Sequence, residues 1–578
     1  MERRCNTSAL SWEDTKDIID SQKLEELGRS AAQHAHYRAS LDSIMEHYAS
    51  IGDYIKISKL DVESCDDGSG KLASTGKRLE NARTSSLVLL KNDFPYHFES
   101  NIQHYVLWKY AATSDYGIGI SDCLSTAEIE WGAQQLSESL FPLHVEIQHW
   151  INPEALKSIP DVDHCHFVVR VADATEIFQH LLLSPHEEGY RRAAEMLALG
   201  ELVAFPTETV YGLGANALDE KAVLSIFEAK GRPLTDPLIV HIADAASAAP
   251  LVSLTEVGQT LFEKLGNTFW PGPLTTIVRA SSMIPPQVTA HTGFVGIRVP
   301  AHPIANQLLA KCGLPIAAPS ANRFGHVSPT SASHVLADLG TKGVHVINGE
   351  FQSSGTDDKS TLTCEYGIES TVLRIDEERK KIIIFRQGAV SQKQLQSALV
   401  EFFEMGWEIE AIQKHVKMEG SDKPKNQSVS ETVGGQEAPG QAITHYAPDV
   451  PCYLMEMVLK AGEARGQDCT PILEFTQTQL KNEVAVLDFG QWANKRIGAN
   501  KFLAYRDMSE RGSTKEAAAL VFDCLRWAET LSLKGAKFVL LAPVENSVSS
   551  EDGFDLTLGL VDRMNRATSG RKIRLRVV

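Results

Sequence analysis

Short apolar runs alternate with amphipathic segments through the middle of the chain. At 202–241, LVAFPTETVYGLGANALDEKAVLSIFEAKGRPLTDPLIVH, an apolar run ended by Pro206 precedes a helical pattern from Asp219 and a second apolar run at 238–241. Further strand-like runs follow at 274–278, 295–299, 314–318, 344–347, 371–375 and 382–385. The alternation predicts an α/β domain on a twisted sheet over residues 184–404.

The boundaries of this domain are marked by local signals. SPHE at 184–187 has the form of a capping box with proline at the first helical position, and it predicts a helix that runs to about Leu199. Gly212 and Gly214 predict a tight backbone turn after the first strand.

The flanking regions differ in composition. Residues 1–85 are mostly polar, with a helix predicted near 31–48 and a flexible linker near 63–76, whereas 86–183 have the composition of a small α+β domain. Residues 405–440 contain few large apolar side chains and predict a second linker. Strand-like runs then alternate with helices across 441–578, at 452–454, 472–475, 484–489 and 538–542.

Polar residues gather where the apolar runs of the central domain end. Thr207-Glu208-Thr209 follows the first run, and Lys230-Gly231-Arg232-Pro233 follows the helix. Each motif alone has a plainer interpretation, because the second is also a good helix stop and the first a plain turn. Gly-Leu-Gly at 212–214 lacks the spacing of a dinucleotide-binding fingerprint.

The order of the motifs along the chain is more specific than any single motif. PTETVYGLG, KGRP and PLIVH are followed by WPGPLT (270–275), GIRVPAHP (296–303), APSANRFGHVSPT (318–330), ESTV (369–372) and FRQGAV (385–390). This series resembles the YrdC/Sua5 family, the threonylcarbamoyl-AMP synthases. Residues 441–578, which contain DRMNRAT at 562–568, resemble the smaller Rossmann-like domain of the Sua5 type. Residues 86–183 resemble a eukaryotic family of unknown function.

The resemblance implies a reaction and the residues for it. The substrates would be L-threonine, bicarbonate and ATP, the last with Mg²⁺, and the products threonylcarbamoyl-adenylate and pyrophosphate. Such chemistry needs cations, hydroxyls and backbone donors that hold anions together, and no Ser-His-Asp set. The implied catalytic residues are Lys230 and Arg232. The implied threonine contacts are Thr209, His241, Arg298, Ala318 and Ser370. The implied ATP contacts are Arg232, Asp236, Ser320, Asn322, Ser328, Arg386, His445 and Tyr446.

Several of these residues have structural alternatives that the sequence leaves open. Arg298 fits a solvated strand end, and His241 fits a core histidine bonded to a carbonyl group. Ser320 and Asn322 fit an ordinary polar turn. His445-Tyr446 would form a lid over the site or a fixed tether.

The sequence also departs from the family pattern. Asp236 stands where asparagine is common, Asn348-Gly349-Glu350 replaces a more usual Asp-Gly-Gly, and the loop at 350–366 is lengthened. The acid would lie close to the phosphates, where it would weaken ATP binding or recruit magnesium. The changes after Asn348 put the phosphate contacts near Ser370 in question.

Composition and charge narrow the class of protein. A chain of 578 residues with 43% hydrophobic and 22% charged residues predicts three or four globular domains. No apolar run approaches the length of a membrane span, and the start has no signal-peptide core. Nine scattered cysteines without a Cys-x-x-Cys pair predict free thiols. These features favour a cytoplasmic protein, with a mitochondrial share left open.

Nucleic acid is expected as the downstream acceptor of the product. A formal charge of -18 provides no general attraction for RNA, so weak RNA binding would need a local basic surface. The resemblance implies that tRNA receives the product through a separate threonylcarbamoyl transferase, at adenosine 37.

Rival interpretations remain at this stage. A non-catalytic RNA-binding module of the same fold would have lost residues such as Lys230 and Arg232, and the carbamoyl-transfer enzyme of hydrogenase maturation would carry Cys-x-x-Cys zinc motifs. The N-terminal domain could be a scaffold or a separate activity. His164 and His166 share one face of a strand-like run, so a metal site there is conceivable, although packing histidines are more common.

Overall fold

The computed structural model describes the chain in two compact units, Met1–Asp173 and Ala174–Val578. The described residues are 5–79, 87–99, 101–109, 123–140, 145–157, 159, 162–171, 174–350, 364–412, 436–439, 446–459, 470–544 and 556–578. Among them, no helix is both long and apolar enough to cross a membrane.

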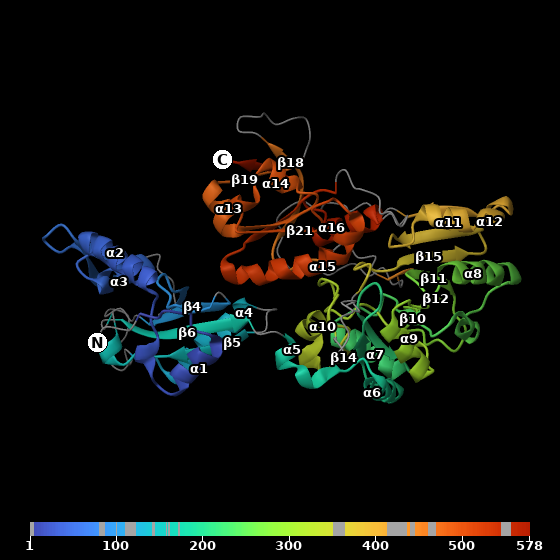
Figure 1. Ribbon diagram of the computed structural model, residues 1–578, viewed down its shortest axis with the longest axis horizontal. Coiled ribbons are helices and arrows are strands. Elements are labelled where there is room, and N and C mark those ends of the chain that lie inside the picture. The colour runs from blue at the N-terminus through green and yellow to red at the C-terminus, as the bar shows by residue number, and fades with distance from the viewer. Residues whose placement is uncertain are drawn as a thin grey trace. The chain divides into compact units, whose positions relative to one another are not determined.

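The N-terminal unit is an antiparallel sheet with helices packed beside it (Figure 1). Its strands, in sheet order, are β3 (Leu87–Lys91), β4 (Ile102–Lys109), β6 (Asp163–Val171) and β5 (Val145–Trp150). Its helices are α1 (Trp12–Asp20), α2 (Ala31–His47), α3 (Ile51–Lys59) and α4 (Thr126–Ser139). Phe167 and Val168 of the central strand β6 are fully buried. The unit has the predicted α+β architecture, and α2 matches the predicted helix.

The first predicted linker is wrong. Within 63–76 the chain forms an antiparallel hairpin of β1 (Val62–Asp66) and β2 (Leu72–Arg78). The Asp66 and Asp67 side chains accept hydrogen bonds from the backbone amides of Gly68 and Ser69, at 2.7 and 2.8 Å. The polar composition is therefore that of a tight turn, in which aspartate bonds its own backbone two residues on.

The second unit begins with an eleven-stranded sheet in the order β17-β16-β15-β11-β12-β10-β13-β9-β8-β14-β7. Its strands are β7 (Leu182–Leu183), β8 (Val203–Phe205), β9 (Gly212–Asn216), β10 (Ile239–His241), β11 (Leu274–Arg279), β12 (Phe294–Arg298), β13 (Ile316–Ala317), β14 (His345–Ile347), β15 (Thr371–Asp376), β16 (Lys381–Arg386) and β17 (Glu408–Ala411). Each strand-like run of the central domain coincides with one of these strands, so the predicted sheet is confirmed.

Helices flank this sheet and bury their apolar faces against it. They are α5 (Ala174–Ile177), α6 (Glu187–Ala198), α7 (Glu220–Lys230), α8 (Glu256–Phe269), α9 (Pro303–Cys312), α10 (Ala332–Leu339), α11 (Gln392–Ala398) and α12 (Val400–Glu404). The helix α7 illustrates why they form where they do. Asp219 caps its first turn, Val223 and Ile226 are fully buried, and Gly231 ends it in the left-handed conformation with φ 63°.

Two local predictions in this domain are corrected. Gly212 and Gly214 lie in the strand β9 and not in a turn, and a Cβ atom at Gly214 would come within 2.9 Å of the Ile316 and Phe205 side chains. Glycine is thus required for close packing of neighbouring strands. The capping box at 184–187 is absent: α6 begins at Glu187, and its N-cap His186 makes no side-chain cap.

The remainder of the second unit is a six-stranded, fully parallel sheet (Figure 1). In sheet order its strands are β19 (Ile472–Phe475), β23 (Lys572–Val577), β18 (Cys452–Leu459), β22 (Phe538–Leu541), β20 (Val484–Asp488) and β21 (Ala504–Asp507). Its helices are α13 (Gln477–Glu483), α14 (Trp492–Arg496), α15 (Thr514–Thr530) and α16 (Thr557–Ala567). This is the Rossmann-like domain that the sequence predicts.

Candidate active site

A cleft of about 550 Å³, part of it open to solvent, lies in the second unit where β10 and β12 end. Nine of the residues implied from the sequence line it: Thr209, Arg232, His241, Arg298, Ala318, Ser320, Ser370, Arg386 and Tyr446. Four further implied residues do not line the cleft: Lys230, Asp236, Asn322 and Ser328. They are buried, and each lies close in sequence to a lining residue. His445 lies outside the described residues.

Arg298 ends β12 in register with His241 at the end of β10. Its guanidinium donates to Thr209 Oγ1 at 3.0 Å and to Glu208 Oε1 at 2.6 Å. Arg298 is therefore not a solvated strand end, because it is only 4% exposed and is held by a buried carboxylate. This pairing fixes the plane of a cation at the wall of the cleft.

His241 is a neutral ring at this wall. Burial, together with the positive charge of Arg298, lowers its pKa to about 3. Its Nδ1 atom is buried and makes no hydrogen bond to any described residue. A buried polar atom without a partner costs free energy, so a ligand that supplies a hydrogen bond here would bind favourably.

Lys230, at the last position of α7, turns towards the backbone of the loop after β13. Its Nζ donates to the carbonyl of Ser320 at 2.6 Å and to the carbonyl of Asn322. Burial and the neighbouring Arg232 lower the pKa of Lys230 well below its usual range. Both contacts hold the loop in place even if the amine is neutral, because a neutral amine keeps two N–H groups.

Arg232 lies just past α7 and reaches the cleft. It donates to the carbonyls of Asp236 and Pro237, at 3.2 and 2.9 Å, and its Nη2 lies 3.0 Å from Asp236 Oδ2. Asp236 is only 1% exposed. The acid that departs from the family pattern is thus the buried counter-ion of Arg232.

Ser370 and Arg386 form a second polar wall of the cleft. Arg386 donates to the Ser370 carbonyl at 3.0 Å and to its Oγ at 3.1 Å, and that Oγ lies 2.8 Å from Thr275 Oγ1. Ser370 precedes β15, and Arg386 ends the antiparallel neighbour β16. The sheet register therefore brings the two together.

Glu369 also lines the cleft, although it was not among the implied site residues. It accepts a hydrogen bond from Ser328 Oγ at 2.5 Å and from Arg563 Nε at 3.0 Å. Arg563, on α16, is fully buried and also donates to the carbonyls of Glu369 and Gln387. The Rossmann-like domain thus contributes one cation directly behind the cleft.

Comparisons with known proteins match both domains of the second unit. Residues 195–388 match a family model described as telomere recombination, and residues 390–569 match one described as the threonylcarbamoyl-AMP synthase C-terminal domain. Threonylcarbamoyl-AMP synthase of Pyrococcus abyssi is 38% identical over 46% of this chain and 67% of its own. That of Schizosaccharomyces pombe is 31% identical over 69% of this chain and 93% of its own. The chain belongs to the threonylcarbamoyl-AMP synthase family.

The structure agrees with this membership. The crystal structure of Pyrococcus abyssi Sua5 complexed with L-threonine is 30% identical and covers 68% of this chain and 99% of its own, with a TM-score of 0.50. Residues 11–170 match a different family model, described as a protein of unknown function. The N-terminal unit therefore adds to the synthase domains of this family member.

Tyr446 closes one side of the synthase cleft. Its backbone is left-handed, with φ 63°, and its ring is 1% exposed. The ring centroid lies 5.3 Å from that of Phe522 on α15 and 5.8 Å from the guanidinium carbon of Arg563. Tyr446 and Pro439 line the cleft from the segments on either side of 440–445. Pro439 and Tyr446 thus form one wall of the site.

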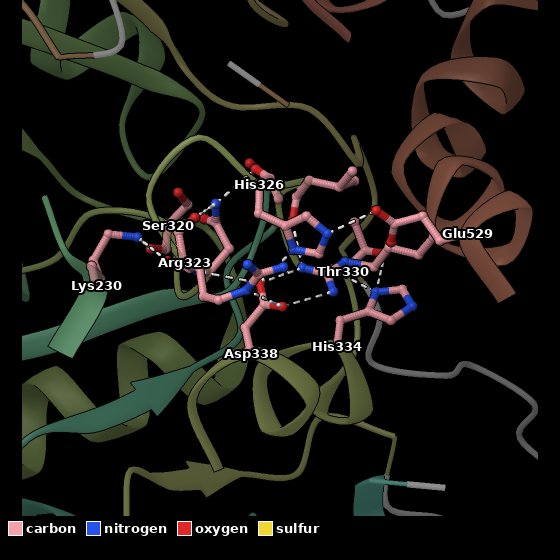
Figure 2. A network of polar contacts seen from close by, with 12 residues as sticks. Lys230, Ser320, Arg323, His326, Thr330, His334, Asp338 and Glu529 are labelled. Atoms are coloured by element: carbon pink, nitrogen blue, oxygen red, sulfur yellow. Dashed lines mark hydrogen bonds and ion pairs between the residues drawn. The ribbon is translucent and has the colours of Figure 1, made fainter. Parts of the chain in front are cut away.

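A buried charge network joins the same two domains (Figure 2). The His326 ring lies between two carboxylates, 2.9 Å from Asp338 Oδ2 on α10 and 2.9 Å from Glu529 Oε1 on α15. Arg526, also on α15, donates to Asp338 at 2.9 Å. Burial and Arg526 act to lower the pKa of His326, but the bonds to Asp338 and Glu529 outweigh them and raise it. The ring therefore bridges the two domains, and its two carboxylate partners favour the protonated form.

Potential metal ligands come close together at one place in the described part of the chain. One group of three lies close together, His326, Asp449 and Glu529. Hydrogen bonds within this group already engage its ligand atoms, because Glu529 Oε1 accepts from both His326 and the Asp449 amide, the latter at 2.8 Å. His164 and His166 form no such group. His166 instead contacts His104, at 3.0 Å, and Asn152, at 2.9 Å.

The departure at 348–350 has a structural role beside the cleft. Glu350 Oε1 accepts from the Ala332 amide at the start of α10, at 2.9 Å, and from the Tyr211 hydroxyl at 3.3 Å. Tyr211 is itself a cleft residue. Glu350 thus holds Tyr211 in place at the cleft. Residues 351–363 of the lengthened loop lie outside the described residues.

Sequence reasoning missed Glu208, Glu369 and Arg563 as site residues. All three stand inside quoted motifs, so a signal existed for each. Their roles depend on contacts between residues that are 90 and 194 positions apart. Such pairings follow from the three-dimensional fold and are not visible in local spacing.

Proposed function

We propose that this protein makes L-threonylcarbamoyladenylate and pyrophosphate from L-threonine, bicarbonate and ATP. The observation that carries the proposal is the lining of the cleft, which places one neutral histidine beside three arginines and several hydroxyl groups. Such a lining suits a substrate with an amine, a carboxylate and phosphates. The curated relatives carry the corresponding enzyme name.

Threonine would bind at the wall formed by β10 and β12. Its carboxylate would pair with Arg298, whose orientation Glu208 and Thr209 already fix. Its ammonium and hydroxyl would be held by His241, Thr209, Ser370 and the backbone at Ala318. A neutral His241 suits this task, because a charged imidazolium would repel the ammonium of the substrate.

The first chemical step would be carboxylation of the amine. The threonine ammonium first releases a proton to solvent. The free amine nitrogen then attacks the bicarbonate carbon, the new N–C bond forms, and hydroxide leaves with an amine proton as water, which leaves a carbamate. The cleft contributes by holding both reactants together with cations that balance their negative charge.

The second step would be attack of a carbamate oxygen on the α-phosphorus of ATP. The bond to the β-phosphate oxygen breaks, and pyrophosphate leaves. Arg232 and Arg386 would neutralise charge on the phosphates, and Ser320 would add a hydrogen bond. No covalent enzyme intermediate is needed.

Lys230, Asn322, Ser328 and Asp236 would act by positioning other groups. Lys230 holds the Ser320–Asn322 loop, Ser328 holds Glu369, and Asp236 holds Arg232. Asn322 donates to the His326 carbonyl at 2.8 Å and keeps a buried Oδ1 without a hydrogen-bond partner among the described residues.

Among the described residues, the carboxylates at the cleft form no group of three or more potential metal ligands. Glu369 is held by Ser328 and Arg563, Asp236 by Arg232, and one oxygen of Glu208 by Arg298. Mg²⁺ prefers several free oxygen ligands in octahedral geometry. The proposal therefore involves no ion held by protein carboxylates, and Mg²⁺ would enter with ATP as part of the substrate.

His445 and Tyr446 would act as a lid over the nucleotide. The mixed anhydride is easily hydrolysed, so a closed and dry site would protect it until it is handed on. The downstream acceptor would be adenosine 37 of tRNA, reached through a separate transferase, and the cytoplasm would be the site of action.

The test is pyrophosphate release by the purified full-length protein with Mg²⁺, ATP, threonine and bicarbonate, each omitted in turn. Release that requires both threonine and bicarbonate supports the proposal. Release without threonine would mean a simple ATPase. No release by folded protein would favour the RNA-binding alternative.

A further inference from the structure

The N-terminal unit contains a cavity of its own, between the helix pair α2 and α3 and the sheet. It encloses about 770 Å³ of empty space, part of it open to solvent. The helix α2 forms one wall with Tyr37, Leu41 and Ile44. None of the 17 residues of this helix is buried. A helix is normally stabilised by burying one face, but the face of α2 that carries these side chains is only half-buried.

Aromatic rings line the cavity from α2, α3, β4 and the loop before β4. They are Tyr37, Tyr54, Phe94, Tyr96 and Trp108. Tyr37 and Phe94 meet edge to face with centroids 5.3 Å apart, so part of the wall is already shaped by ring packing. Rings and aliphatic side chains that face empty space give up dispersion contacts that a bound molecule would restore.

Charge in the cavity is unevenly distributed. Its charged lining residues are three cations, Arg29, Lys59 and Lys91, and one carboxylate, Asp93. Asp93 forms an ion pair with Lys59, with 2.8 Å between Nζ and Oδ2. The lining therefore retains an excess of positive charge, which would attract an anion.

Arg29 is the best-placed of these cations. Its guanidinium carbon lies 4.0 Å from the Tyr37 ring centroid and 5.3 Å from that of Tyr96, and Nε and Nη2 both donate to the Phe94 carbonyl. No carboxylate among the described residues pairs with it. Burial lowers its pKa, which reflects the cost of removing this charge from water.

Polar groups also stand at the inner end of the cavity. His164 and His166 on β6 line it, and His166 Nδ1 lies 3.0 Å from His104 Nε2. A mostly apolar cavity with a few convergent polar groups is the usual form of a small-molecule site.

We propose that the N-terminal unit binds a small aromatic or heteroaromatic molecule with one anionic group. The ring system lies between α2 and the sheet against Tyr37, Phe94 and Trp108, and the anion pairs with Arg29. The occupant supplies the apolar surface that α2 lacks and the negative charge that Arg29 lacks. The site is independent of the synthase cleft, because every lining residue belongs to the N-terminal unit.

The test uses two probes on the full-length protein. The first, 8-anilinonaphthalene-1-sulfonate, has an aromatic body and one anionic group, and the second, N-phenyl-1-naphthylamine, has a similar body without charge. We expect saturable binding of the anionic probe, at least tenfold tighter than that of the neutral one, followed by its fluorescence. Equal binding of both probes would overturn the proposal.

Variants locate the site. Arg29→Met should weaken the anionic probe at least tenfold, whereas Arg38→Met, the same change at an exposed position of α2, should leave binding unchanged. Leu41→Trp keeps the charge but fills the cavity, and it should block both probes while far-ultraviolet circular dichroism stays unchanged. Retained binding in a folded Leu41→Trp protein would contradict the proposal.

Two competitors then identify the anion. Displacement of the probe by indole-3-acetate but not by AMP would assign a carboxylate, and the reverse result would assign a phosphate. Displacement by neither compound would overturn the proposal.

Discussion

Lys230 belongs to the family motif, yet its amine faces two backbone carbonyls and not the cleft. We predict that Lys230→Met lowers the free energy of unfolding by about 1–3 kcal/mol, since each buried carbonyl then lacks its donor. Chemical denaturation with a fluorescence readout would measure this. Synthesis should fall as well, because the loop that carries Ser320 loses its support.

Lys221→Met is the matched control, because Lys221 is exposed on the same helix. It should leave both stability and synthesis unchanged. If Lys230→Met abolished synthesis with no loss of stability, Lys230 would be a direct contact of the substrates and not a positioning residue.

Arg298 offers the clearest test of the threonine wall. Arg298→Gln removes the charged partner of the substrate carboxylate, which should cost about 1.5–3 kcal/mol. We expect KM for threonine to rise roughly tenfold to a hundredfold, with a smaller change in KM for ATP, measured by pyrophosphate release. Arg279→Gln, at the exposed end of β11, is the control. Equal effects on both substrates would contradict the assignment.

Sequence alone could identify the residue types at the site but not all their partners. Thr209, Arg298, Ser370 and Arg386 follow from motifs at strand ends, and the sheet register brings them together. The contact of Arg563 with Glu369 could not be predicted, because it depends on how two domains pack.

At the scale of elements, most strands and helices are visible in the sequence, since buried strands need apolar runs and capped helices need polar ends. The β1–β2 hairpin and the strand β9 are the exceptions. Aspartate and glycine mark flexible linkers and tight turns alike, and Gly214 is required by a neighbouring strand that lies about a hundred residues further on.

The helix α16 supplies the cation behind the cleft, so the Rossmann-like domain should affect catalysis. We predict that Arg563→Met raises KM for ATP about tenfold, because Glu369 then loses a buried counter-ion and Tyr446 loses a neighbour. Pyrophosphate release at varied ATP would measure it. Arg511→Met, at an exposed position of the same domain, should have no effect.

A change in stability alone would argue against this role of Arg563. Thermal unfolding of the variant therefore accompanies the kinetics. If Arg563→Met unfolds at lower temperature but keeps the wild-type KM at a temperature where it is folded, α16 only supports the fold.

At the scale of the whole synthase unit, the network around His326 makes the domain contact depend on pH. The pKa of His326 is raised in the folded protein. Its contribution to the stability of the fold is therefore complete below its pKa in the unfolded chain, about 6.5. That contribution is lost as pH rises through its pKa in the folded protein. The pKa of Asp338 is lowered well below its usual range, so its contribution to stability is lost only at strongly acidic pH. The charged or titratable groups near the ring are Asp338, Glu529, Arg526, Arg323, His334 and Asp449.

We therefore predict that the thermal midpoint of the synthase unit falls as pH rises above about 6.5, as measured by calorimetry of the full chain. His326→Gln keeps a polar side chain that does not titrate, and it should flatten this decline. An identical decline in His326→Gln would show that other groups cause it.

The central claim is that the carbon of bicarbonate joins threonine to the α-phosphate of ATP in the cleft. The most direct measurement is mass spectrometry of the nucleotide products after incubation with threonine, ATP, Mg²⁺ and carbon-13-labelled bicarbonate. The account predicts an adenylate that contains threonine and the labelled carbon, and its absence in Arg232→Ala protein. Unlabelled threonyl-adenylate, or AMP alone, would contradict it.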